Sequence, residues 1–142
     1  MSAYSDYLKN KIHDHVLRNR SFTPASPLYW SLWTAAGTDA GGGTEVSGGN
    51  YSRVSITPSD TAFTNTQGTT SGASSGTGGT VSNGAIVQFP TPSASWGTPV
   101  EARLYDAASG GNMYIREPLV PKVINSGDDV KFPVGSSTLQ IK

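Results

Sequence analysis

The chain contains 142 residues, with ten basic and ten acidic side chains and a formal net charge of zero. Because only 14% of the residues are charged, we expect neither nucleic acid nor a membrane surface as a partner. The absence of cysteine excludes a disulfide scaffold, thiol catalysis and a cysteine-ligated zinc site. The 17 glycines and nine prolines are typical of one turn-rich β domain, and no apolar run is long enough for a signal peptide or a membrane span.

Residues 1–20 are predicted to form the one helix of the chain. An apolar side chain recurs every four residues and forms a narrow stripe, at Tyr4, Leu8, Ile12 and Val16. A lone helix of this length is marginal in water, so the stripe must pack against another surface. Two interpretations remain open: the helix docks on its own sheet, or it is an arm that binds a neighbouring subunit. A proline-containing linker, residues 21–27, separates it from the rest of the chain.

Two strands separated by a glycine loop are predicted over residues 28–56. In the first strand Trp30 points to one face while Tyr29 and Trp33 point to the other, so both faces are expected to be covered. The return strand begins at Tyr51. Aromatic side chains on a β scaffold can form a protein interface or a platform for sugars, and Tyr29, Trp33 and Tyr51 are candidate partner-binding residues. Packing inside the fold is the simpler interpretation for each of them.

Residues 64–80 are rich in serine, threonine and glycine and predict a flexible surface loop, because few apolar side chains offset the entropy of ordering. Short strands follow at 85–89, 100–105, 113–116, 120–124 and 130–134, and a last one holds Leu139 and Ile141. In the second of these, Val100, Ala102 and Leu104 are expected to point inward. The predicted fold is mainly β, a single antiparallel β-sandwich or jelly-roll-like domain of about eight strands over residues 28–142, with one N-terminal helix.

The residues that carry chemistry do not converge. His13 and His15 are two positions apart on the predicted helix, so they diverge and cannot share a metal ion. Gly72–Gly76 matches the letters of a nucleophile elbow without the strand and helix that the elbow needs. Aspartates such as Asp128–Asp129 could bind calcium, although solvated turn caps explain them better. We expect a protein without catalytic residues, cofactor or metal.

Several segments resemble a family of small virion proteins of tailed bacteriophages. The most specific is Thr38–Gly49, which reads Thr-Asp-Ala-Gly-Gly-Gly-Thr-Glu-Val-Ser-Gly-Gly, and Tyr4–Leu8, Trp96–Thr98 and Asn125–Asp128 add to it. The similarity covers nearly the full chain. Members of this family are labelled head-decoration (cement) or tail-fibre proteins. The resemblance implies a non-enzymatic structural part of the virion, made in the host cytoplasm, and it transfers no catalytic residues.

The resemblance leaves three functions open. We first expect a capsid decoration or cement protein that binds the major capsid protein and stabilises the lattice through repeated contacts. A tail-fibre or baseplate component involved in host attachment, with tail proteins as partners, is the alternative. A carbohydrate-binding module that uses exposed aromatic side chains is the third interpretation. Self-association within the particle is expected in either virion role.

Overall fold

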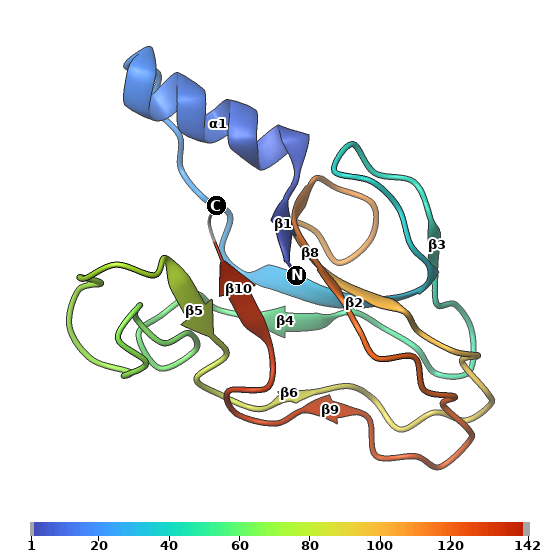
Figure 1. The fold of residues 1–142 in the computed structure, drawn as a ribbon. Coiled ribbons are helices and arrows are strands. Elements are labelled where there is room, and N and C mark those ends of the chain that lie inside the picture. Colours follow the sequence, from blue (N-terminus) through green and yellow to red (C-terminus); the bar gives the residue numbers. More distant parts are fainter. Residues whose placement is uncertain (1, 141–142) are drawn as a thin grey trace.

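A computed structural model describes residues 2–140 and shows antiparallel sheets from which a single helix projects (Figure 1). The elements in chain order are β1 (Ala3–Tyr4), α1 (Asp6–Leu17), β2 (Leu28–Ala35), β3 (Thr44–Glu45), β4 (Val54–Ile56), β5 (Thr80–Ser82), β6 (Val87–Gln88), β7 (Glu101–Tyr105), β8 (Met113–Pro118), β9 (Lys131–Phe132) and β10 (Thr138–Gln140). The prediction of a mainly β, antiparallel fold with one helix near the N-terminus is confirmed. The described residues form ten strands, against about eight expected. The number is higher because several strands are only two residues long.

The main sheet has the order β1-β8-β7-β2-β3, and β4 pairs with β2 as well. All of its pairings are antiparallel, and Trp30 of β2 lies opposite Leu104 of β7 while Ser31 lies opposite Arg103. Because side chains alternate along each strand, this register gives the sheet one apolar face and one polar face.

The apolar face carries the core. Trp30 packs edge-to-face against Phe132 of β9, with ring centroids 5.4 Å apart, and Phe132 contacts Phe89 in the same way at 5.7 Å. The two small sheets, β6 with β9 and β5 with β10, supply this second layer. Leu139 of β10 joins the same buried cluster. The core is therefore a sandwich between one broad sheet and two short two-stranded sheets.

The polar face is buried as well. Glu101 is 1% and Arg103 is 0% exposed, and the carbonyl of Gly42 in the overlying glycine loop accepts a hydrogen bond of 2.8 Å from Arg103. The alternating pattern correctly placed Ala102 and Leu104 inside. It did not indicate that every residue of β7 is buried, because a loop covers the second face.

Several expected strands are shorter in the structure: the return strand expected from Tyr51 begins at Val54, and the strand expected at 85–89 covers Val87–Gln88. The segment 120–124 forms no strand, and Ile124 makes only an isolated bridge with Gly97, since Pro121 cannot donate to a ladder. The strand expected at 130–134 is shorter, since β9 covers Lys131–Phe132 only, and Val134 lies beyond it and is exposed. Ile141 lies outside the described residues. The only helix found in residues 2–140 is too short and too polar to cross a bilayer.

Candidate interaction surface

The start of α1 is fixed to the sheet through Ser5. The Ser5 side chain is buried, its Oγ accepts a hydrogen bond of 3.1 Å from the amide of Leu8, and it donates to the carbonyl of Met113. The Ser5 amide donates to the carbonyl of Tyr114 at 2.9 Å. A serine in extended conformation directly before a helix satisfies one of its free amides, so the same residue caps the helix and ties it to β8.

The first half of α1 packs on the body of the protein. Leu8 belongs to the buried core, and the ring of Tyr7 stacks on Tyr114 with centroids 5.8 Å apart. Phe22 in the returning segment contacts the same ring at 6.4 Å, and the amide of Ala25 donates to the Tyr114 hydroxyl. Burial raises the pKa of Tyr114. Both the start of α1 and the segment that returns from it therefore contact Tyr114.

Charged side chains reinforce this anchor. Lys9 of α1 and Arg116 of β8 both pair with Asp39 in the glycine loop, the latter at 2.8 Å. Their hydrogen bonds, first from Lys9 and then from Arg116, hold the pKa of Asp39 below its usual range. Arg116 also reaches Glu101 at 3.3 Å. A continuous set of ion pairs thus runs from the helix, through the glycine loop, to the buried face of the sheet.

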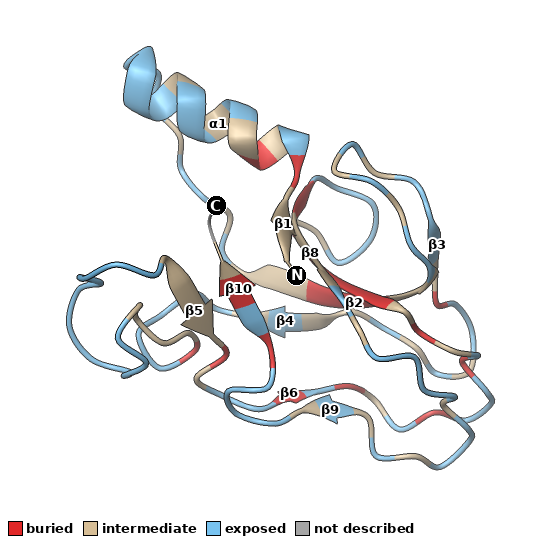
Figure 2. Cartoon of the chain, viewed as in Figure 1, coloured by how far each residue is buried: buried red, intermediate tan, exposed pale blue. Residues whose placement is uncertain are grey.

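The second half of α1 projects into solvent. Figure 1 shows the helix leaving the body of the protein, and Figure 2 shows its far turns exposed. Ile12 is 37%, Val16 is 69% and Leu17 is 72% exposed. We call these three residues the distal helix end. Within residues 2–140, Val16 and Leu17 keep most of their surface exposed, and apolar side chains exposed on a short helix are typical of a contact with another protein.

The predicted stripe is therefore divided between two environments. Tyr4 pairs with Ile115 in the sheet and Leu8 lies in the core, whereas Ile12 and Val16 extend beyond it. Burial raises the pKa of Tyr4. Leu17 was missed because it does not fall on the four-residue spacing. Its position directly after Val16, about 100° further round the helix, was the available signal.

Trp33 takes part in a stack on the polar face of the sheet. The guanidinium of Arg103 lies 3.7 Å from its ring centroid, and Tyr105 stacks nearly parallel to it at 6.0 Å. Its indole nitrogen donates to Ser31 Oγ at 2.9 Å. Tyr29, the neighbouring candidate, is half-buried and lies opposite Tyr105. The contacts of Trp33 are thus made within the chain.

Tyr51 is likewise engaged inside the fold. Its hydroxyl donates to Glu45 and accepts from the amide of Leu32, both at 3.0 Å. Its ring meets Trp96 edge-to-face at 5.3 Å. Burial raises the pKa of Tyr51. The seven candidate residues therefore do not gather into one site, and Ile12 and Val16 are the two that face solvent most openly among the apolar ones.

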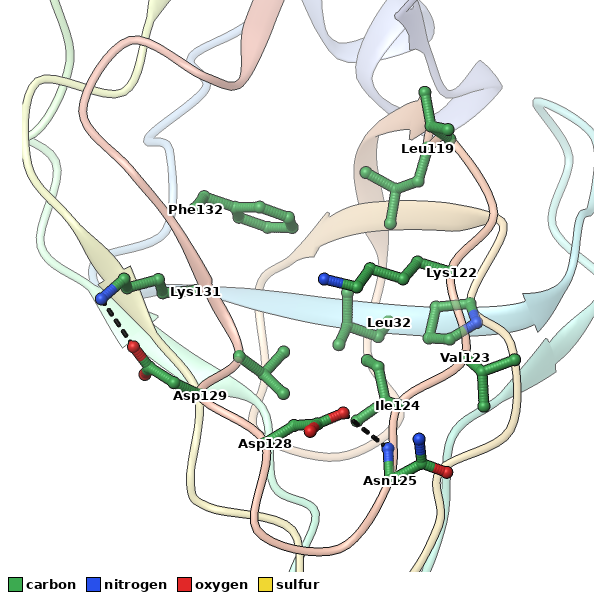
Figure 3. A pocket seen from close by; sticks show the side chains of 13 residues that line it. Leu32, Leu119, Lys122, Val123, Ile124, Asn125, Asp128, Asp129, Lys131 and Phe132 are labelled. Atoms are coloured by element: carbon green, nitrogen blue, oxygen red, sulfur yellow. Dashed lines mark hydrogen bonds and ion pairs between the residues drawn. The ribbon is translucent and has the colours of Figure 1, made fainter.

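A second unfilled surface lies far from the helix. The segments Leu119–Ile124 and Asp128–Phe132 form the walls of an open cavity of about 430 Å³, with Leu32 at its base (Figure 3). Pro99 also lines it. We call it the Leu119–Phe132 groove. Val120 on its wall is 91% exposed. Its lining is mainly apolar, and the charged side chains among the lining residues are Lys122, Asp128, Asp129 and Lys131.

The described residues offer little for catalysis. No group of three or more histidine, cysteine, aspartate or glutamate side chains within residues 2–140 is placed to hold a metal ion. His13 and His15 are both exposed on α1.

Comparison with known proteins identifies the family of the chain. A search of curated proteins returned no match. A family model described as podophage GP4 fiber I protein gp80 matches residues 3–140, almost the entire sequence. The resemblance to phage virion proteins seen in the sequence is thereby confirmed. The chain belongs to the podophage GP4 fiber I protein family, a family of structural proteins of bacteriophages.

Proposed function

We propose that the chain is a structural component of the tail fibre of a podophage, which acts by binding other virion proteins and carries out no reaction. The observation that supports this role is the match of residues 3–140 to a family described as a fibre protein. The distal helix end fits the same role, because it presents unpartnered apolar side chains on an element that is firmly anchored at its other end.

The fibre role replaces capsid decoration as the preferred function. A decoration protein and a fibre protein both need surfaces for other subunits, so the fold alone favours neither. The family description names a fibre. The third interpretation, a sugar platform, has weaker support because Trp33 and Tyr51 use their rings and polar atoms in contacts within the chain.

Location and copy number on the particle test the proposal. An epitope tag inserted at residues 71–76, which are all exposed, allows gold labelling of intact virions in the electron microscope. We expect label at the tail and a copy number far below that of the major capsid protein in quantitative mass spectrometry. Label spread over the head, with a copy number comparable to that of the capsid subunit, would instead establish decoration.

A further inference from the structure

We propose that the distal helix end of one copy docks into the Leu119–Phe132 groove of a second copy and so joins the copies head to tail. This inference rests on the proposed role in a fibre and identifies a partner for α1. It follows from three observations: both surfaces expose apolar side chains, each offers a charged side chain of opposite sign that makes no ion pair within residues 2–140, and they lie at opposite ends of the molecule.

The helix supplies the inserting surface. Ile12 and Val16 lie along one side of α1, and Leu17 lies about 100° further round, so the last turn is apolar on two sides. The contacts at Ser5 and Tyr114 hold the first half of the helix on the sheet. A helix fixed at one end can present its other end without first being ordered, which lowers the entropy cost of binding.

The groove supplies the receiving surface. Val123 lies on one side of the groove and Phe132 on the other (Figure 3), and Val120 and Val130 also line it. Val120 and Val123 are exposed. Leu32 at the base belongs to the core, so a side chain that enters would continue the packing of the sandwich. The cavity of about 430 Å³ gives room for the apolar side chains of a helix end.

Among the described residues, each surface offers one charged side chain of opposite sign that makes no ion pair, Arg20 near the helix end and Asp128 at the groove. Near the helix end, Arg18 is paired with Asp14 at 2.8 Å, whereas Arg20 takes part in no ion pair within residues 2–140. At the groove, Asp129 is paired with Lys131 at 2.6 Å, and Asp128 only accepts a hydrogen bond from the amide of Asn125. Asp128 can therefore pair with Arg20 of the incoming copy.

Lys122 adds a second electrostatic match. Its side chain extends across the groove (Figure 3). The last turn of a helix carries free carbonyl oxygens and a partial negative charge, which a lysine ammonium group stabilises. An inserted C-terminal end of α1 would bring those carbonyls to Lys122.

The relative positions of the two surfaces require a second molecule. In Figure 1, α1 projects from one end, and the segments around Leu119–Ile124 and Asp128–Phe132 lie at the other. The contacts of Ser5 and Tyr114 hold the start of α1 on the sheet, and no residue of α1 lines the groove of its own chain. A contact between two different surfaces leaves one of each free, and it extends into a row or closes into a ring. Each contact buries less than a standard interface, so association should be weak in solution and stronger where copies are held together.

Complementary variants test the docking. Val16→Asp with Leu17→Asp blocks the helix end, and Val120→Asp with Val123→Asp blocks the groove; all four side chains are more than half exposed, so the fold should be retained. In sedimentation velocity, we expect the mass of the unmodified protein to rise with concentration and each variant to stay monomeric. An equimolar mixture of the two variants should form a heterodimer and nothing larger, because each contributes its one intact surface.

A control variant and a charge exchange accompany these two variants. Ile86→Asp changes an exposed apolar residue that does not line the groove and should leave association unchanged. Arg20→Asp and Asp128→Arg should each weaken association several-fold, and the two changes in one chain should restore it. Association that survives the groove variant but not the helix variant would mean helix-to-helix pairing and overturn the docking, as would a protein that is monomeric at every concentration. Such a protein could still label the tail, so failure of the docking is separable from failure of the fibre role.

Discussion

The guanidinium carbon of Arg103 lies 3.7 Å from the centre of the Trp33 ring, on the face of the sheet that the glycine loop covers. Arg103 is fully buried, its Nε donates to Glu101 and its Nη1 donates to the carbonyl of Gly42. A buried cation needs such partners because its desolvation is costly. The glycine loop, whose sequence is the most specific part of the resemblance to phage virion proteins, thus covers a buried ion pair.

Replacing Arg103 by methionine should lower the free energy of unfolding by about 3–5 kcal/mol, because Glu101 would remain buried with only Arg116 nearby. Urea titrations followed by tryptophan fluorescence measure this change. The double variant Glu101→Gln with Arg103→Met should lose less than the sum of the single changes. Additive losses would show that the pair does not act as a unit.

Gly43→Ala should destabilise the protein more than Gly48→Ala. Both glycines have positive φ, +86° and +72°, so alanine costs roughly 1–2 kcal/mol at either position. At Gly43 an added Cβ would also lie 2.4 Å from the carbonyl oxygen of Ala35, whereas nothing lies within 4 Å at Gly48. The difference in stability between the two variants, measured by thermal unfolding, gives the cost of this close contact. Equal losses would mean that the backbone angle alone demands glycine.

Ser5→Ala should loosen α1 and lower the free energy of unfolding by about 1–2 kcal/mol, since the helix loses its cap and Met113 loses a buried hydrogen bond. Hydrogen exchange of the helix amides should become faster than that of β2 and β7. The matched control is Ser47→Ala, because Ser47 is exposed. If the exchange rates of α1 stay unchanged, the Ser5 hydroxyl does not hold the helix.

Asp39→Asn should reduce the loss of stability in acid. The pKa of Asp39 is lowered in the folded protein by Lys9 and then Arg116, so its contribution is present above the unfolded value of about 3.9 and disappears as the pH falls through the folded value. The variant should therefore be less stable than the natural protein at pH 7, with a smaller difference at pH 2. Asp129, whose pKa is also lowered, keeps part of the acid dependence in both proteins. Asp60→Asn, on an exposed loop, serves as the control.

The exposed end of α1 could be predicted only in part. The four-residue spacing of Leu8, Ile12 and Val16 defines a stripe, and it leaves open what the stripe contacts. In the structure Leu8 packs in the core while Val16 stands in solvent, because the helix crosses the edge of the body. Where that edge lies depends on β8 and Tyr114, about a hundred residues further along the chain.

Alternation and turn residues by themselves determined the class of fold and the central strand, because the two-residue period of Leu28–Thr34 and the helical period before it are local consequences of backbone geometry. Only the tertiary structure decided that Glu101 and Arg103 are buried and that Trp33 and Tyr51 pack inward. Charged residues at alternate positions of a strand have the pattern of a solvent-facing side, and a loop distant in the sequence covers that side here. Burial of these side chains depends on contacts between segments far apart in the sequence, and a local sequence pattern does not predict such contacts.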